Sequence, residues 1–525
     1  MTTHTPLWRR LLRWLAIALT LLVLLALSGL LLADHLTPRA LGPRSSVLPP
    51  GPEQTAIDRE LVRLQAEHPG QTGVAFLADG LDAYAARAVI TRHAGRSLDL
   101  QYYIWHDDLI GHLMAQELYQ AAERGVRVRI LLDDMNAQDK DALMMALDEH
   151  PNIEIRLYNP FRNRNGLWRL VEMVQRFFSV NHRMHNKAWI ADGRVAIVGG
   201  RNIGEEYFSA RPDVNFRDLD LLVAGKAVAQ ANTIFDAYWN SDTAVPISAL
   251  AFYTPAQLRL LVRESAHEAR LDAAQPYLRR VAQSESARSY YRDTVDLHWS
   301  ANVEIASDPP MKHRRDDQAD WLVTRLVREL QATRHKALLI SPYFVPGEEG
   351  TAGMAAMVQR GATVAVVTNS LAANDVAAVH GGYMHYRAPL LRSGVHLYEL
   401  KAHGHTDGGG LFGSSGASLH TKAFMIDDRR GFVGSFNLDP RSAYLNTEMG
   451  VLFDDPWLAA QLRSEYLRLA DPGESYWVTL DSRGQVRWLD RDAQPPVLLD
   501  REPDASFWLR ASARAISWLP LESQL

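Results

Sequence analysis

The chain has 525 residues, 47% hydrophobic and 22% charged, a balance typical of a folded globular protein that excludes disordered and fibrous classes. This length allows two or three domains with full hydrophobic cores. The net charge of -5 excludes a generally basic surface for nucleic acid, and the lack of cysteine excludes disulfides, thiolate zinc sites and cysteine nucleophiles.

The N-terminus carries an apolar segment. Residues 14–33, "WLAIALTLLVLLALSGLLLA", contain no charge, and 20 helical residues at about 1.5 Å each span a hydrocarbon core of about 30 Å. Three arginines precede the segment and are expected to stay in the cytoplasm, which places the remaining chain on the periplasmic face of the inner membrane. A cleaved signal peptide is the alternative, but the stretch is longer than a usual h-region and no clear A-x-A site follows. We therefore expect residues 1–35 to be an uncleaved, single-pass membrane anchor.

Residues 36–69 are expected to form a linker. The stretch "TPRALGPRSSVLPPGPE" within it is rich in proline, glycine and serine, which indicates a tether between the membrane and the folded part.

Beyond this linker, the chain divides into two halves that repeat the same run of elements. "SLDLQYYIWHDD" and "ALLISPYFVPGEE" each predict a buried strand, and "AAERGVRVRILLDD" and "MVQRGATVAVVTNS" each predict a helix that ends at glycine before a second strand. "NIEIRLYNP" and "GVHLYELKA" supply the third strand. Alternating strands and helices predict α/β layers. We expect domains at 70–250 and 311–490, a helical connector at 251–310 and a C-terminal tail at 491–525.

A short motif occurs once in each half. "HNKAWIAD" contains His185, Lys187 and Asp192, and "HTKAFMID" repeats the same spacing 235 residues later. The histidine and lysine are two apart in a predicted strand, so both side chains leave the same face. Each motif continues after six residues into "GGRN" or "GSFN", which makes coincidence untenable. A metal site is disfavoured because a lysine lies beside each histidine without a carboxylate cluster.

The doubled motif resembles the phospholipase D superfamily, whose members carry two HxKxxxxD motifs, each followed by a glycine-rich turn and an asparagine. The match extends from about residue 70 to about residue 488. "QYYIWHDD" and "RMHNKAWIADGRVAIVGGRNIGEEYF" are further similar to bacterial cardiolipin synthases of the C type. The resemblance implies two tandem phospholipase D-like α/β sandwich domains with pseudo-two-fold symmetry, and no cofactor or metal.

The resemblance also implies phosphatidyl transfer in two steps through a phosphohistidine. One motif histidine attacks phosphorus, and the other protonates the leaving alcohol and then deprotonates the incoming one. By the family's common assignment, His185 is the nucleophile and His420 the acid and base. Lys187 and Lys422 would neutralise the phosphoryl oxygens. Asparagines in the following turns would donate hydrogen bonds to the same oxygens: Asn202 and Asn437.

Each histidine also needs an acceptor that orients it. The superfamily places an acidic residue near the start of the strand after each motif, where this chain has Asp218 and Glu448. Asp220 competes for that role in the first half. Asp192 and Asp427, the motif carboxylates, are interpreted as structural.

A phosphodiester pocket fits either lipid or nucleic acid, and the expected anchor favours lipid. We expect phospholipid substrates, namely phosphatidylglycerol with phosphatidylethanolamine as a further candidate, and no nucleic acid. Water as acceptor would give phosphatidic acid, and a glycerol-headgroup lipid would give cardiolipin. A hydrolase or nuclease of the same superfamily and a non-catalytic membrane scaffold are the alternatives.

Three further segments have possible roles in lipid contact. Residues 161–183 hold five arginines against one glutamate, interleaved with aromatics, a composition that suits an anionic lipid interface; a helix packed on the domain is the alternative. The C-terminal "SFWLRASARAISWLPLESQL" is either a second interfacial contact or a docked helix. The glycine-rich 405–418 is either a mobile lid or an ordinary surface loop.

Overall fold

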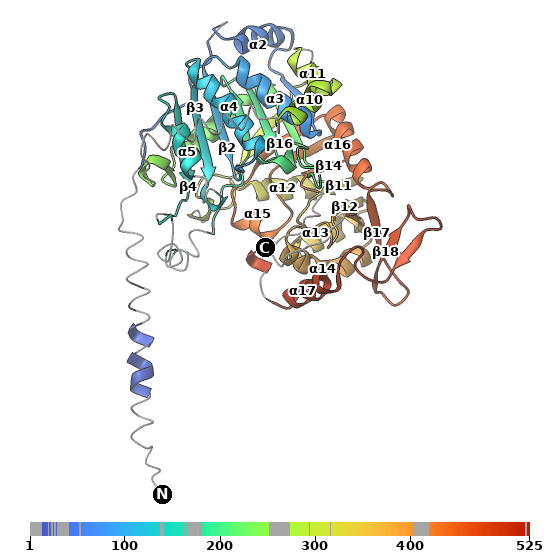
Figure 1. The fold of residues 1–525 in the computed structure, drawn as a ribbon. Coiled ribbons are helices and arrows are strands. Elements are labelled where there is room, and N and C mark those ends of the chain that lie inside the picture. The colour runs from blue at the N-terminus through green and yellow to red at the C-terminus, as the bar shows by residue number, and fades with distance from the viewer. Residues whose placement is uncertain are drawn as a thin grey trace.

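The computed structural model describes most of the chain (Figure 1). The described residues are 13–18, 20–22, 25, 28, 41–51, 54–136, 141–161, 163–164, 172, 176, 181–250, 274–292, 295–314, 317–402, 419–519 and 522–524. Within these ranges, no helix has the length and apolar character needed to cross a bilayer. Half of residues 14–33 lies outside them, so the expected membrane span stays a prediction.

The first half forms a nine-stranded sheet in the order β8-β4-β3-β2-β5-β6-β7-β1-β9. Strands β2, β3 and β4 run parallel, and the remaining neighbours pair antiparallel. In sheet order the strands are Ala244–Pro246, Ile153–Tyr158, Arg127–Asp133, Ser97–Tyr102, Ala188–Ala191, Val195–Gly199, Asp220–Gly225, Thr72–Leu77 and His298–Ser300.

The second half forms a ten-stranded sheet in the order β10-β16-β15-β14-β11-β12-β13-β17-β18-β19. In sheet order these strands are Val303–Ser307, Met449–Asp454, Arg430–Gly434, Lys422–Ile426, Lys336–Ile340, Thr363–Asn369, His396–Leu400, Ser475–Leu480, Val486–Asp490 and Val497–Leu499. Again three neighbours, β11, β12 and β13, are parallel, and β14, β15, β16 and β10 follow antiparallel. The matching strand orders confirm the predicted tandem copies of one α/β fold.

Helices cover both sheets. Their bounds are α2 Ala56–Glu67, α3 Gly80–His93, α4 Leu109–Glu123, α5 Asp141–Asp148, α8 Val228–Trp239, α10 Ala274–Gln283, α11 Glu285–Tyr291, α12 Leu322–Gln331, α13 Gly347–Gln359, α14 Ala377–Arg392, α15 Pro440–Tyr444, α16 Pro456–Leu469 and α17 Phe507–Ser517. The short 3-10 helices are η1 Asp134–Asn136, η2 Glu205–Tyr207, η3 Ile247–Ala249, η4 Lys312–Arg314 and η5 Glu522–Gln524. Helices α3 and α4 lie across the first sheet (Figure 1), and α12, α13 and α14 share a core with the second.

The repeated helix-to-strand turns follow from glycine. Gly125 after α4 and Gly361 after α13 adopt φ of +91° and +92°, a left-handed conformation that favours glycine. Each turn leads within a few residues into a buried strand, β3 or β12. This conformational preference of glycine explains why both sequence patterns predict a helix followed by a strand.

The halves meet through their sheets. One hydrophobic cluster contains side chains of both, among them Val198, Leu221, Val433 and Val451, together with α8 and α16. Two isolated parallel bridges join the halves. Met184 pairs with Thr447, and Arg217 pairs with Leu419. The halves therefore pack against each other through the faces of corresponding strands, β6 and β7 of the first sheet against β15 and β16 of the second.

The expected linker and connector differ from what the structure shows. Within 36–69, residues 56–67 form α2, and the extended chain before it is docked: the Ser45 N–H donates to Asn240 Oδ1 at 3.0 Å and the Val47 N–H to Asp236 Oδ2 at 2.8 Å. Within 251–310, α10 and α11 are helical, but β9 and β10 add an edge strand to each sheet. The edge strand of a sheet has backbone N–H and C=O groups without partners, and a further strand can pair with them.

Candidate active site

Each motif histidine lies just before a short strand and is held by the opposite half of the chain. His185 precedes β5, and its backbone N–H donates to the carbonyl of Thr447 at 2.9 Å. His420 precedes β14, and its N–H donates to the carbonyl of Arg217 at 2.8 Å. The boundary between the halves therefore positions both motifs.

The two imidazoles are oriented by carboxylates that cross the same boundary. His185 Nδ1 lies 2.8 Å from Glu448 Oε2, and His420 Nδ1 lies 2.6 Å from Asp218 Oδ2. Both carboxylates are buried. A hydrogen on Nδ1 donated to a carboxylate leaves the other ring nitrogen as the lone-pair donor. Each half thus supplies the acid for the histidine of the other half.

Asp220, the competing carboxylate, is engaged elsewhere. Its Oδ2 accepts from Arg87 Nη2 at 2.8 Å, and its Oδ1 accepts from the backbone of Arg201 at 3.1 Å. The side chains of Asp220 and Arg87 are buried together as an ion pair. The structure therefore places Asp218, and not Asp220, beside a motif histidine.

The two motif lysines are buried beside the histidines. Lys187 Nζ donates to the carbonyl of His185 at 2.6 Å and lies 5.5 Å from the ring centre of Tyr103. Lys422 Nζ donates in the same way to the carbonyl of His420. In both motifs the ammonium group is thus folded back toward the histidine backbone.

The charges of the two motifs act on one another. Burial lowers the pKa of Lys187 to about 7, while Glu448 raises it and Lys422 lowers it further. Burial lowers the pKa of Lys422 to about 8, against the opposing pull of Asp218 and Glu448. Because Lys187 responds to both the lysine and the carboxylate of the other half, the motifs form a single electrostatic site.

The two histidine–carboxylate pairs differ in charge distribution. Burial and the two motif lysines hold the pKa of His185 well below its usual value, and burial raises the pKa of Glu448 to about 7. Burial also lowers the pKa of His420 to about 4, although Asp218 raises it. Burial alone would raise the pKa of Asp218, but His420 lowers it. The ionised Asp218 therefore favours a proton on His420 more than Glu448 does on His185.

Aromatic rings pack against both imidazoles. Tyr103 meets His185 edge-on with ring centres 5.1 Å apart. His420 has Tyr207 at 5.1 Å edge-on and Phe216 at 5.3 Å stacked. Within "QYYIWHDD", Tyr103 contacts the site, whereas Tyr102 and Trp105 pack on the buried Trp189.

Other functional neighbours were missed by the sequence analysis. Ser435 donates its hydroxyl to Glu448 Oε2, and its carbonyl lies 3.1 Å from His185 Nδ1. Asp308 accepts the backbone N–H of Glu448 at 2.9 Å and pairs with Lys312 at 3.0 Å. The "GSFN" motif contains Ser435 and could have revealed it; no comparable sequence signal marks Asp308.

The two asparagines lie in the turns after the motifs. Asn202 Oδ1 accepts the N–H of Ile104 at 3.1 Å, and its amide donates to the hydroxyl of Tyr207 at 3.0 Å. Asn437 is buried, and among the described residues its side-chain oxygen has no hydrogen-bond partner. Tyr207 in turn contacts His420, so Asn202 reaches the site through that ring.

The motif aspartates lie at the far ends of the motif strands. Asp192 accepts backbone N–H groups of residues 95, 96 and 97, and Asp427 accepts those of residues 334, 335 and 336. Both stand at positive φ, near +52° and +53°. They fix the start of the neighbouring strand, β2 or β11, and are not brought to the histidines.

The arginine-rich segment 161–183 lies largely outside the described residues, as does 405–418. The arginines that are described face acids of the protein: Arg164 with Asp134 at 2.6 Å, Arg176 with Glu172 at 2.9 Å, and Arg183 with Asp133 at 3.2 Å. These three guanidinium groups are thus paired internally. Across the described part of the chain, no group of three or more His, Asp or Glu side chains has a metal-binding arrangement.

Comparison with known proteins gives the family. The model of "Cardiolipin synthase, PLD-like domain" matches residues 90–239 and 326–470. Cardiolipin synthase C of Escherichia coli is 40% identical over 465 residues, 87% of this chain and 97% of that protein. Cardiolipin synthase 2 of Staphylococcus epidermidis is 25% identical over 72% of this chain and 63% of that protein.

A solved structure shares the fold. The phosphatidylserine synthase of Haemophilus influenzae superposes with a TM-score of 0.57 at 14% identity, over 89% of this chain and all of that one. That likeness concerns the arrangement of the two sheets and their helices. The family model and the Escherichia coli relative show that the chain belongs to the cardiolipin synthase family of the phospholipase D superfamily.

Proposed function

We propose that this phosphatidyltransferase makes cardiolipin by moving a phosphatidyl group from one phospholipid to the glycerol headgroup of another. The observation that carries the proposal is the pair of crossed contacts, His185 with Glu448 and His420 with Asp218, around two buried lysines. Relatives named cardiolipin synthase support a lipid substrate over nucleic acid.

In the first step, His185 is the nucleophile. Its unprotonated ring nitrogen attacks phosphorus, a P–N bond forms, and the P–O bond to the donor's headgroup alcohol breaks. His420 gives its proton to the departing oxygen. The low pKa of His185 keeps that ring neutral. Burial also lowers the pKa of His420, to about 4, so its proton depends on the buried Asp218 at Nδ1 and on the negative charge of the bound phosphodiester, which both raise that pKa.

In the second step, His420 takes the proton from the hydroxyl of the acceptor lipid. The hydroxyl oxygen attacks phosphorus, the P–N bond breaks, and His185 is regenerated. Lys187 and Lys422 offset the extra negative charge on the phosphoryl oxygens in both transition states. Asn437, a buried asparagine in the turn after the second motif, would donate from its NH₂ group to the same oxygens.

A transfer assay tests this function. Purified protein in mixed micelles of phosphatidylglycerol should form cardiolipin and free glycerol, with phosphatidic acid a minor product. EDTA should leave the rate unchanged, because lysines replace a metal in charge neutralisation. Phosphatidic acid as the main product would assign a hydrolase, and cleavage of plasmid DNA without lipid turnover would assign a nuclease. No turnover of either substrate would support the scaffold alternative.

We also propose that residues 1–35 anchor the enzyme, with the catalytic part on the periplasmic face. Removal of these residues should release most of the protein from washed membranes and leave transfer in micelles unchanged. Fractionation followed by the micelle assay measures both. Retention on membranes would assign attachment to another surface, and loss of micelle activity would make the segment part of the site.

A further inference from the structure

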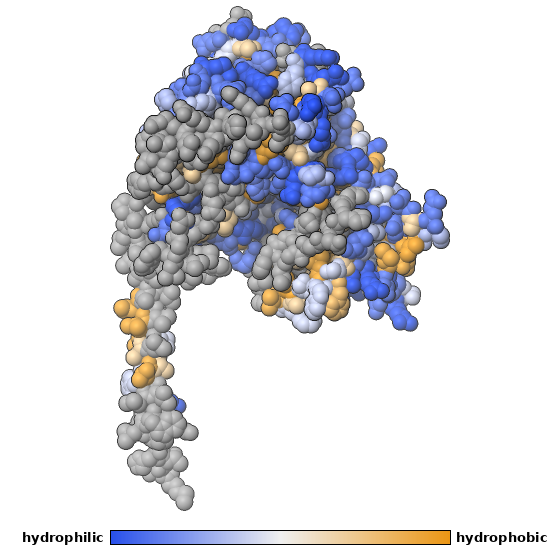
Figure 2. Space-filling model, viewed as in Figure 1, coloured by the Kyte–Doolittle hydropathy of each residue, from blue (hydrophilic) through white to orange (hydrophobic). Residues whose placement is uncertain are grey.

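The outward face of the C-terminal helix α17 is apolar. Its largest exposed side chains, by fractional exposure, are Phe507 at 66% and Trp508 at 79% at its start, and Trp518 at 79% and Leu519 at 55% just past its end. Figure 2 shows apolar side chains along the lower edge of the body, where Figure 1 places α17. Such a cluster on a soluble surface marks an interaction site.

The spacing makes this face continuous. Residues 507, 511, 515 and 518 recur at helical intervals, and 508 and 519 flank the same stripe. Ala511 and Ala515 are exposed between the aromatic rings, and the exposed Arg514 stands at the edge of the stripe. An apolar stripe with tryptophan and a flanking arginine is the pattern of a helix lying at a lipid interface.

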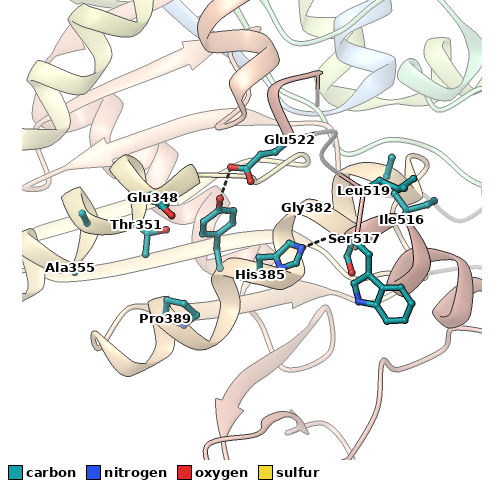
Figure 3. Close-up of a pocket in the computed structure, with 14 residues that line it drawn as sticks. Glu348, Thr351, Ala355, Gly382, His385, Pro389, Ile516, Ser517, Leu519 and Glu522 are labelled. Atoms are coloured by element: carbon teal, nitrogen blue, oxygen red, sulfur yellow. Dashed lines mark hydrogen bonds between the residues drawn. The ribbon is translucent and has the colours of Figure 1, made fainter. Parts of the chain in front are cut away.

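The opposite face of α17 is firmly docked, so the exposed rings are not simply a loose end. Ala513 is buried, and its backbone approaches Gly381 of α14 so closely that a Cβ there would lie 3.0 Å from the Ala513 carbonyl. His385 Nε2 lies 2.8 Å from the carbonyl of Ser517 (Figure 3). A cavity of about 670 Å³ lies beside these contacts and is lined by α13, α14, the end of α17 and the residues that follow it. The helix therefore holds a fixed orientation.

The chain leads directly from α17 to the catalytic boundary. Tyr386 of α14 donates to Glu522 in η5 (Figure 3). Two residues later, the Gln524 side chain accepts from Asn181 Nδ2 at 2.6 Å, and Arg441 donates to Asn181 Oδ1 at 2.9 Å. Asn181 lies four residues before His185, and Arg441 four after Asn437. The segment that follows α17 thus contacts residues close in sequence to both motifs.

We infer that α17 lies in the headgroup region of a phospholipid bilayer and turns the active-site end of the protein toward that bilayer. The orientation rests on the proposed function, because an acyl-chain substrate reaches the site from the membrane. The inference that the helix enters the headgroup region rests only on its exposed apolar face. A second copy of this chain is the other occupant to test. The four exposed side chains offer on the order of 500 Å², which is below the about 800 Å² per partner of a stable dimer.

The absence of cysteine gives a direct test on the full chain. Single cysteines are placed at Trp508→Cys, Trp518→Cys and Ala515→Cys, with Arg63→Cys in α2 as the matched exposed control. Each is labelled with a nitrobenzoxadiazole dye and reconstituted in vesicles of phosphatidylethanolamine and phosphatidylglycerol, with or without doxyl-labelled lipid. We expect a blue shift and loss of about half of the emission to the doxyl quencher at the three α17 positions, and neither at position 63.

The outcomes separate the alternatives. Because every variant keeps its N-terminal segment, attachment alone cannot produce a difference between positions. Equal, weak quenching at all four positions would overturn the inference, as would a blue shift without quenching that grows with protein concentration, which would assign the face to a second copy. Ala515→Cys adds one sulfur to an exposed alanine and so guards against misfolding. Quenching requires no turnover, so its failure leaves the transfer assay to judge the proposed function separately.

Discussion

Replacement of His185 by alanine should reduce phosphatidyl transfer by about a thousandfold or more, because the P–N intermediate can no longer form. The loss should be in kcat, since the lysines that bind the phosphate remain. His93→Ala, at the exposed end of α3, is the matched control and should retain full activity. Cardiolipin formation in micelles and a thermal melt of each variant measure the result.

A phosphatidyl ester of p-nitrophenol sharpens this test, because its leaving group departs without a proton. His420→Asn should still release about one equivalent of p-nitrophenol in a burst, since His185 is intact, and should then stop. His185→Ala should show no burst. A burst from His185→Ala and none from His420→Asn would exchange the two roles, and a burst from neither would remove the covalent step.

A fall in kcat/KM as the pH rises through about 7 to about 8 is the second large effect that we expect. An ammonium group must be protonated to attract a phosphodiester, and burial lowers the pKa of Lys187 to about 7 and that of Lys422 to about 8. Both charges are therefore present at pH 6 and lost by about pH 9, and kcat/KM follows groups of the free enzyme.

Lys422→Met should lower kcat/KM by about a hundredfold at pH 6 and make the remaining decline shallower, because one of the two titrating cations is gone. Lys226→Met, at an exposed lysine, should leave both the rate and the profile unchanged. A wild-type profile that stays level up to pH 9 would contradict the lowered lysine pKa values or their role in binding.

The sequence predicted what depends on local pattern. The repeated strands, the glycine turns after α4 and α13, and the histidine–lysine spacing all lie within short windows, where side-chain periodicity and backbone conformation are set locally. The two tandem sheets follow from the same repetition. The edge strands β9 and β10 were missed because their pairing partners are distant and the strands themselves are short.

The sequence predicted which residues form the site, but it did not predict which of them contact one another. Asp218 and Glu448 could be named from their positions. Which histidine each one contacts could not be predicted from local sequence patterns, because the contact depends on how the two folded halves associate. Asp220 illustrates the limit: it is two residues from Asp218, and only the burial of Arg87 beside it shows that it is engaged elsewhere. The docking of residues 45 and 47 on α8 was missed for the same reason, since proline- and glycine-rich composition describes stiffness and not contacts.

The crossed carboxylates have a consequence for how such a chain acquires its activity. During synthesis, the first half of the chain is made while its histidine still lacks the carboxylate of Glu448, so the site is complete only when the second half has folded. The same exchange is what two identical subunits would achieve as a symmetric pair. Covalent fusion removes the requirement that both be identical, and here one copy supplies aspartate and the other glutamate, so the two imidazoles have different charge environments.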